Sequence, residues 1–127
     1  MYRIAVLTDR TRDGRNYVEQ ITRFCMSRGL LPQIELHNDQ ERFFHGILDE
    51  KPSCIVLALP GVAGLNAVEH LRSLCPDCGI MWCSDLDFSL QAFRLRIEYF
   101  LLEPITPEAF SHGLTVLFEI HMKRNRN

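Results

Sequence analysis

Short apolar runs and helical repeats of apolar residues alternate along the whole chain. The longest run, Cys54 to Leu59, is too short for a buried helix and rich in β-branched residues. It therefore predicts a strand that is covered on both faces. Pro60-Gly61 ends this strand, and a helical repeat follows at Leu65, Val68, Leu71 and Leu74. Ligands of parallel sheets bind where strands end, yet residues 54–65 contain no carboxylate, His, Ser, Lys or Arg.

Four further strands and four further helices follow from the same pattern. The strands are expected at residues 4–7, 33–37, 80–83 and 99–102. The first helix is expected from Asp13 or Gly14 to Gly29, and the second from an Asn38 cap to Lys51-Pro52. A fourth helix spans roughly residues 86–94, with Ser84 as its cap and Leu86, Leu90 and Phe93 as its apolar residues. The last helix starts at Thr106-Pro107 and ends near Met122.

Strands that alternate with helices predict an α/β fold with a parallel sheet. We expect a flavodoxin-like, doubly wound sheet of five strands in the order 2-1-3-4-5, with five helices. The 127 residues, 46% of them hydrophobic, fit one domain over residues 1–122, followed by a basic tail or linker start at 123–127. The net charge of −2 requires neither nucleic acid nor an anionic membrane as partner.

Cysteine content and the lack of long apolar segments suggest a location. Five cysteines in a chain whose start does not read as a signal peptide favour a reducing cytoplasm over a disulfide framework. No apolar run approaches the length of a membrane-spanning helix. We therefore expect a cytoplasmic protein without a membrane partner.

Three stretches carry a resemblance to a known family. They are Thr8-Asp9 after the first strand, the segment from Leu59 to Gly64, and the segment from Tyr99 to Ile105. In this order they resemble a bacterial response-regulator receiver domain, CheY-like, across nearly the whole chain. The run from Leu90 to Pro104 is most similar to the receivers of LytTR-type transcription regulators. The resemblance implies a domain of two-component signal transduction.

The family's chemistry is the transfer of a phosphoryl group to an aspartate at the end of the third strand. An acidic pair after the first strand holds Mg²⁺, and a Ser or Thr and a Lys contact the phosphoryl group. The resemblance places Asp9 at one acid of the pair and Thr8 where the other acid is usual. Ser84 falls on the hydroxyl position. The switch aromatic of the family corresponds to Phe100, which we expect to be simply packed.

Two positions depart from the family's pattern. The phosphoacceptor falls on Ala58 or Val56, depending on a small gap in the loop, and the lysine position is Glu103. A phosphoaspartate needs a carboxylate nucleophile and a cation that neutralises the developing charge. The chain therefore resembles a receiver that has lost its switch chemistry, and we expect no catalytic residue and no enzymatic activity.

The sequence leaves weak metal binding open. Asp9 and Glu103 together offer two carboxylates to Mg²⁺, a cation that prefers oxygen ligands. The alternative, which we favour, is that Glu103 pairs with Arg10 or Arg12 across the loops. We therefore expect no cofactor and no resident metal.

The motif Cys75-Pro-Asp-Cys78 has the spacing of a redox or zinc site. It lies where the third helix ends, however, and the negative end of the helix dipole disfavours a thiolate there. A zinc site would need two further ligands, and no second pair has ligand spacing. We interpret both cysteines as structural residues of a turn.

The fourth helix, fifth strand and fifth helix form the face through which the family makes dimers. The residues that the resemblance suggests for an interface here are Phe88, Phe93, Arg94, Arg96 and Tyr99, with Glu98 beside them. The alternative is an ordinary core with a solvated charged rim.

The sequence thus predicts a degenerate, phosphorylation-independent receiver-like domain that forms homodimers or docks on a protein. It would regulate a transcription or signalling protein and would contact DNA only through an output domain that these residues lack. Two alternatives stay open. One is a phosphorelay receiver that uses a displaced carboxylate, Asp85 or Asp9, and the other is a small-ligand sensor between the first and third strands.

Overall fold

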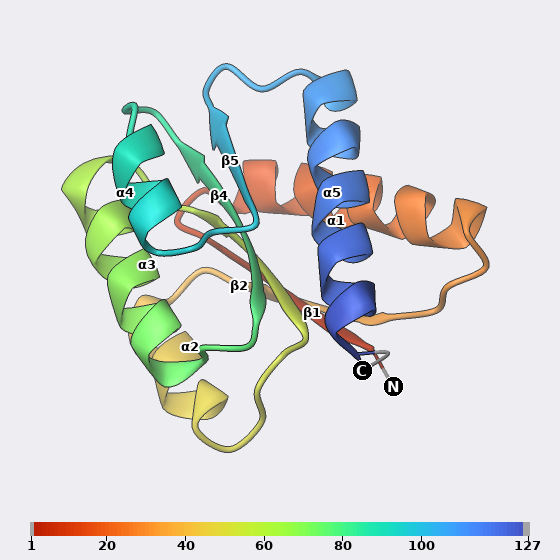
Figure 1. The fold of residues 1–127 in the computed structure, drawn as a ribbon, viewed down its shortest axis with the longest axis horizontal. Helices are drawn as coiled ribbons and strands as arrows, with labels where there is room; N and C mark the ends of the chain where they lie inside the picture. The colour runs from red at the N-terminus through yellow and green to blue at the C-terminus, as the bar shows by residue number, and fades with distance from the viewer. Residues whose placement is uncertain (1, 126–127) are drawn as a thin grey trace.

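In the computed structural model, which describes residues 2–125 and the side chains through residue 121, strands and helices alternate (Figure 1). The elements are β1 (Arg3–Thr8), α1 (Thr11–Ser27), β2 (Gln33–His37), α2 (Gln40–Ile47), β3 (Cys54–Ala58), α3 (Gly61–Leu74), β4 (Gly79–Ser84), α4 (Ser89–Arg94), β5 (Tyr99–Leu102) and α5 (Pro107–Asn125). All five strands are parallel and lie in the order β2-β1-β3-β4-β5. The predicted flavodoxin-like sheet is therefore confirmed.

Helices cover both faces of this sheet, as Figure 1 shows, with α1 and α5 on one side and α2, α3 and α4 on the other. Successive residues of a strand point to opposite faces, so Val56 belongs to the α1–α5 core and Leu57 to the α2–α3–α4 core. Every residue of β3 is buried. This explains why β3 is a continuous apolar run rather than an alternating one.

The start of α1 and both ends of α2 differ from those that the sequence pattern suggests, whereas the end of α1 agrees with it. α1 starts at Thr11, ahead of Asp13, and Gly29 ends it with a positive φ of 69°, as predicted. The cap of α2 is Asp39 instead of Asn38, because its Oδ1 accepts a hydrogen bond from the amide of Arg42 at 3.2 Å. Leu48 follows the end of α2 and is 64% exposed, so it does not belong to the core.

α4 differs most from its prediction. It begins at Ser89, so Ser84 is not its cap, and Ala92 is the residue that α4 buries. Three apolar side chains that the helical pattern assigns to the core are instead exposed: Leu86 at 48%, Leu90 at 56% and Phe93 at 81%. We call these three residues the α4 apolar surface. At the end of the chain, α5 continues past Met122 to Asn125, and residues 126–127 lie outside the described part.

Gly64 allows α3 to pack closely against the end of the third strand. A Cβ atom at this position would lie 2.2 Å from the carbonyl oxygen of Leu59, which is a backbone atom that cannot rotate away. The short connection from Ala58 to α3 therefore requires glycine at this point. The connection sets where the helix begins relative to the carboxyl edge of the sheet.

We expect Gly64→Ala to destabilise the fold by about 1–3 kcal/mol, since the added methyl group forces backbone to move in a packed core. Gly46→Ala on α2 is the matched control, because a Cβ there meets no atom within 4 Å. The control should leave stability unchanged or raise it by up to about 1 kcal/mol through helix propensity. Urea denaturation of both variants measures the difference, and equal stabilities would contradict the close approach.

Candidate functional site

The ends of the three central strands meet at one edge of the sheet. Thr8 of β1 pairs with Ala58 of β3, which pairs with Cys83 of β4. All three residues are buried, with exposures of 0%, 1% and 1%. Val56 pairs instead with Val6 and Met81, inside the sheet. Of Ala58 and Val56, Ala58 is thus the residue at the edge, and its side chain is a methyl group.

The fourth and fifth strands complete this edge. Ser84 pairs with Leu102, and the Ser84 carbonyl accepts a hydrogen bond from the Glu103 amide at 2.8 Å. The Ser84 hydroxyl is buried and accepts a hydrogen bond from the amide of Leu86 at 3.1 Å. This contact orders the loop after β4, which is a different task from the helix cap that the sequence suggested.

Glu103 forms an ion pair across two loops. Its Oε2 lies 2.9 Å from Nη2 of Arg10, and Nε of the same guanidinium lies 3.0 Å from Asp13 Oδ2. The predicted pairing of Glu103 with Arg10 is confirmed. An arginine from the β1–α1 loop therefore faces the Glu103 carboxylate.

The remaining polar groups of the edge are engaged within the loops or face solvent. Thr8 Oγ1 accepts a hydrogen bond from the Arg10 amide at 3.3 Å. Asp85 Oδ1 accepts one from the Gly61 amide at 2.8 Å, which ties the β4–α4 loop to the start of α3. Asp9 is exposed. The edge thus has carboxylates on its rim and a hydrocarbon side chain at its centre.

Burial makes the centre of the edge unfavourable for added negative charge. It raises the pKa of the Cys83 thiol to about 12, with a smaller contribution from the nearby Glu103 carboxylate. A buried group next to an existing carboxylate resists ionisation because the charge loses water and gains repulsion.

The described carboxylate, thiol and imidazole groups near this edge do not converge on one point, as the ligands of a metal ion must. Within residues 2–121, no group of three or more His, Cys, Asp or Glu side chains is placed to hold a metal ion. The pair suggested by the sequence, Asp9 with Glu103, has its Glu103 oxygen facing the Arg10 guanidinium. A groove of about 420 Å³ opens beside this ion pair, lined on one side by Tyr17 and Gln20 and on the other by Ile105.

Cys75 and Cys78 lie in the turn between α3 and β4, and both are buried free thiols. The Cys78 amide donates to the Cys75 carbonyl at 3.4 Å, and the Cys78 thiol donates to the Pro52 carbonyl at 3.1 Å. Burial raises the pKa of Cys78 above the ordinary value of a thiol. These contacts support the interpretation of both residues as parts of a turn.

The candidate interface residues divide into packed and exposed groups. Phe88 stacks on Trp82 at a centroid distance of 5.4 Å, and Phe100 meets the same indole edge-on at 5.1 Å. Phe100 is therefore packed, as expected. Tyr99 is half-buried and contacts His112, whereas Phe93, Arg94 and Arg96 are exposed.

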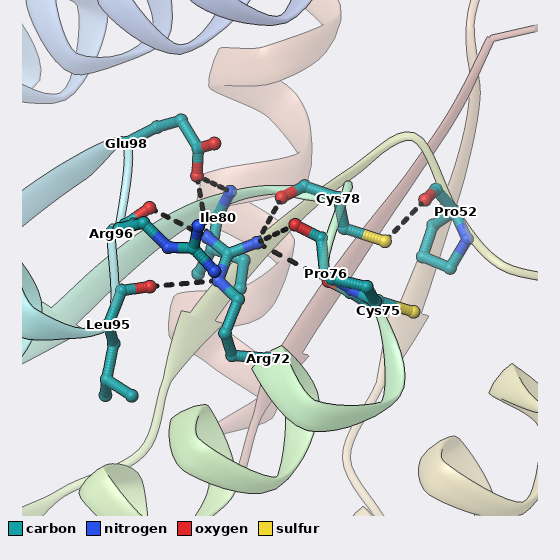
Figure 2. A network of polar contacts seen from close by, with 9 residues as sticks. All are labelled: Pro52, Arg72, Cys75, Pro76, Cys78, Ile80, Leu95, Arg96 and Glu98. Carbon is teal, nitrogen blue, oxygen red and sulfur yellow. Dashed lines mark hydrogen bonds and ion pairs between the residues drawn. The ribbon is translucent and has the colours of Figure 1, made fainter.

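The sequence placed Glu98 beside the candidate interface residues and left open whether it belongs to an interface or to a solvated rim, and the structure shows that its side chain is buried. Its side chain is 1% exposed, and its Oε1 lies 3.0 Å from Nη2 of Arg72, whose side chain is 8% exposed. Figure 2 shows this pair between α3 and the segment before β5. Arg72 was not among the residues predicted from the sequence. The available signal was a cation directly after the apolar Leu71 on the helical repeat.

The fold is that of receiver domains. A CheY-like response-regulator receiver domain from Methanospirillum hungatei superposes with a TM-score of 0.73 at 14% identity, covering 98% of each chain. The Thermotoga maritima response regulator TrrA, solved in complex with Mg²⁺-BeF, gives 0.71 at 16% identity, covering 92% of this chain and 99% of its own. An uncharacterized Neptuniibacter caesariensis protein gives 0.80 at 17% identity, covering 99% and 93%.

The amino-acid sequence itself matches no family model and no curated protein. The similarity to solved structures at these identities therefore establishes the fold, and chemistry has to be argued from the residues. Within residues 2–125, no helix is long and apolar enough to cross a membrane.

We expect the native protein to react slowly with a thiol reagent such as DTNB, since its five cysteines are buried. Reactivity should stay low as the pH rises past the ordinary thiol pKa, because burial raises the pKa of both Cys54 and Cys83 to about 12. The same reagent added in denaturant should titrate all five thiols. Rapid reaction of two native thiols would contradict the structural interpretation of Cys75 and Cys78.

Proposed function

We propose that this chain is a phosphorylation-independent receiver-like domain that acts as a dimerisation or protein-docking module. The observation that carries the proposal is Ala58 at the end of β3, between Thr8 and Cys83. A methyl group cannot accept a phosphoryl group, and the neighbouring residues supply no carboxylate at the same place. The domain would serve as the regulatory part of a response regulator or transcription regulator.

The Arg10–Glu103 ion pair supports the same proposal. A phosphoryl group needs a cation that is free to neutralise it, and here the arginine already has Glu103 and Asp13 as partners. Glu103 itself would repel the incoming phosphoryl group. The site is thus electrostatically closed to the switch chemistry of receivers, and we assign this chain no enzymatic activity and no resident Mg²⁺.

The α4 apolar surface supports a docking role. Leu90 and Phe93 lie at positions i and i+3 of one short helix and hence on the same side, with Leu86 just before it. Arg94 and Arg96 are exposed next to them, and Leu102 of β5 is 47% exposed. Exposed apolar patches rimmed by polar residues mark sites of protein–protein contact. The partner is a second copy of this chain or another protein.

The first test is the solution molar mass by light scattering, with and without acetyl phosphate and Mg²⁺. We expect a mass that the phosphodonor does not change, because the acceptor position is Ala58. A phosphorylatable receiver treated in parallel serves as the positive control, and intact-protein mass spectrometry follows phosphoryl transfer directly. Phosphorylation that depends on Mg²⁺ would overturn the proposal and favour a displaced carboxylate such as Asp85 or Asp9.

The mass also separates the two forms of docking. A dimer indifferent to the donor indicates a permanent self-assembly, and a monomer indifferent to it indicates a separate protein partner. A melting temperature that rises with nucleotides or metal ions would instead favour a small-ligand sensor. The groove beside Arg10 and Glu103 would then be the place to map by substitution.

We expect Phe93→Asp to weaken self-association or partner binding at least about tenfold, because a charge replaces an aromatic side chain that the proposed interface would bury. The fold should be unaffected, since Phe93 is 81% exposed. Leu31→Asp is the matched control, because Leu31 is 87% exposed and lies beside β2 at the opposite edge of the sheet. Sedimentation velocity over a concentration series measures both variants, and equal loss in the control would contradict an α4-centred interface.

A further inference from the structure

One guanidinium connects three separate parts of the chain (Figure 2). Arg72 Nη1 donates to the carbonyls of the α3–β4 turn, at 2.8 Å to Cys78, 3.2 Å to Pro76 and 3.4 Å to Cys75. Its other two nitrogens reach the segment between α4 and β5. Nε donates to the Leu95 carbonyl at 3.0 Å, and Nη2 donates to the Arg96 carbonyl and to Glu98 Oε1, both at 3.0 Å.

Glu98 extends the network to a fourth part. Its Oε1 also accepts a hydrogen bond from the Ile80 amide at 2.8 Å, near the beginning of β4. Because both charges are buried, these contacts act in a low-dielectric interior and are stronger than they would be in water. We call the Arg72–Glu98 pair and its backbone partners the Arg72 clamp.

The clamp binds the chain next to a residue with an energetically unfavourable backbone conformation. Arg96 has a positive φ of 54°, which side chains other than glycine rarely adopt. Hydrogen bonds on either side hold this turn closed: the Leu95 amide donates to Gln91 at 2.9 Å, and the Ile97 amide donates to Ala92 at 3.0 Å. Arg72 adds two bonds from outside the turn, to the carbonyls of Leu95 and Arg96.

The residues of α4 itself make few core contacts, although Phe88 before the helix and Leu95 and Ile97 after it pack against the core. The helix buries Ala92, while Leu90 and Phe93 face outward. Before the helix, Phe88 stacks on the buried Trp82, and after it the chain enters the clamp. The orientation of this short helix is therefore set at its two ends and only weakly by its own packing.

We propose that the Arg72 clamp holds α4 permanently in one arrangement, so that the α4 apolar surface is presented without a phosphorylation signal. The clamp is a positioning device: the hydrogen bonds of Arg72 go to the α3–β4 turn and to the segment 95–98, through which it acts on α4. The last step, from a fixed α4 to docking, rests on the proposed function. The first step, from the clamp to a fixed α4, does not.

The test separates the clamp from general stability. Removing one charge alone leaves the other buried without its partner, which destabilises the whole protein. Arg72→Met combined with Glu98→Gln removes both charges and keeps an oxygen acceptor for the Ile80 amide. Hydrogen–deuterium exchange of residues 86–98 should become at least about tenfold faster in this double variant, with the exchange of β1 and β3 unchanged.

Two further variants serve as controls for this experiment. Arg3→Met combined with Glu35→Gln removes an ion pair between β1 and β2, far along the sheet order from α4, and should leave exchange at 86–98 unchanged. Arg72→Lys keeps the charge but loses the planar fork, so it should also loosen 86–98 while preserving the fold. Unchanged exchange at 86–98 in both Arg72 variants would overturn the proposal, and so would faster exchange spread evenly over the sheet.

Sedimentation of the same variants then tests the docking step. Faster exchange at 86–98 together with at least about tenfold weaker association supports both the clamp and the proposed function. Faster exchange with unchanged association supports the clamp and shows that the α4 apolar surface is not the docking site. The two proposals therefore fail by different measurements.

Discussion

A buried guanidinium must have acceptors for its N–H groups, and this requirement fixes how the α3–β4–α4–β5 half of the molecule is assembled. Arg72 finds its six acceptors in the turn after α3, in the connection after α4 and in Glu98. A displacement of either segment would take acceptors away from this buried guanidinium. Such a network contributes less to net stability than to the choice of one arrangement, because desolvation offsets much of the attraction.

The sheet could be predicted from the sequence because its signal is local. Parallel strands covered on both faces are continuous apolar runs, and each such run in this chain became a strand. The order of the strands then followed from the handedness and shortness of the connections. The predicted helix ends were less accurate than the predicted strands. The cap of α2 is an example, because Asn38 and Asp39 are neighbouring polar residues and either could cap the helix.

α4 and the Arg72 clamp could not be predicted, for a physical reason in each case. Helical spacing of Leu86, Leu90 and Phe93 implies a core face only if a core lies beside the helix, and here Ala92 makes that contact. An isolated charge is normally solvated, so Arg72 and Glu98 gave no sign of pairing across 26 positions of sequence. The register of the strands could not be predicted either. Whether Ala58 or Val56 lies at the edge of the sheet depends on which of them pairs with Thr8.

The Arg10–Glu103 and Arg72–Glu98 ion pairs differ in what they can control. Arg10 and Glu103 have side chains that are 48% and 23% exposed, and pairs in that range contribute only about 0.2–1 kcal/mol. Moving a two-state equilibrium from almost fully one state to almost fully the other requires about 5.5 kcal/mol. Making or breaking the Arg10–Glu103 contact therefore cannot drive α4 between two arrangements. Control of α4 therefore has to reside in buried contacts. At the α4–β5 connection the Arg72–Glu98 pair is such a contact, because its side chains are 8% and 1% exposed.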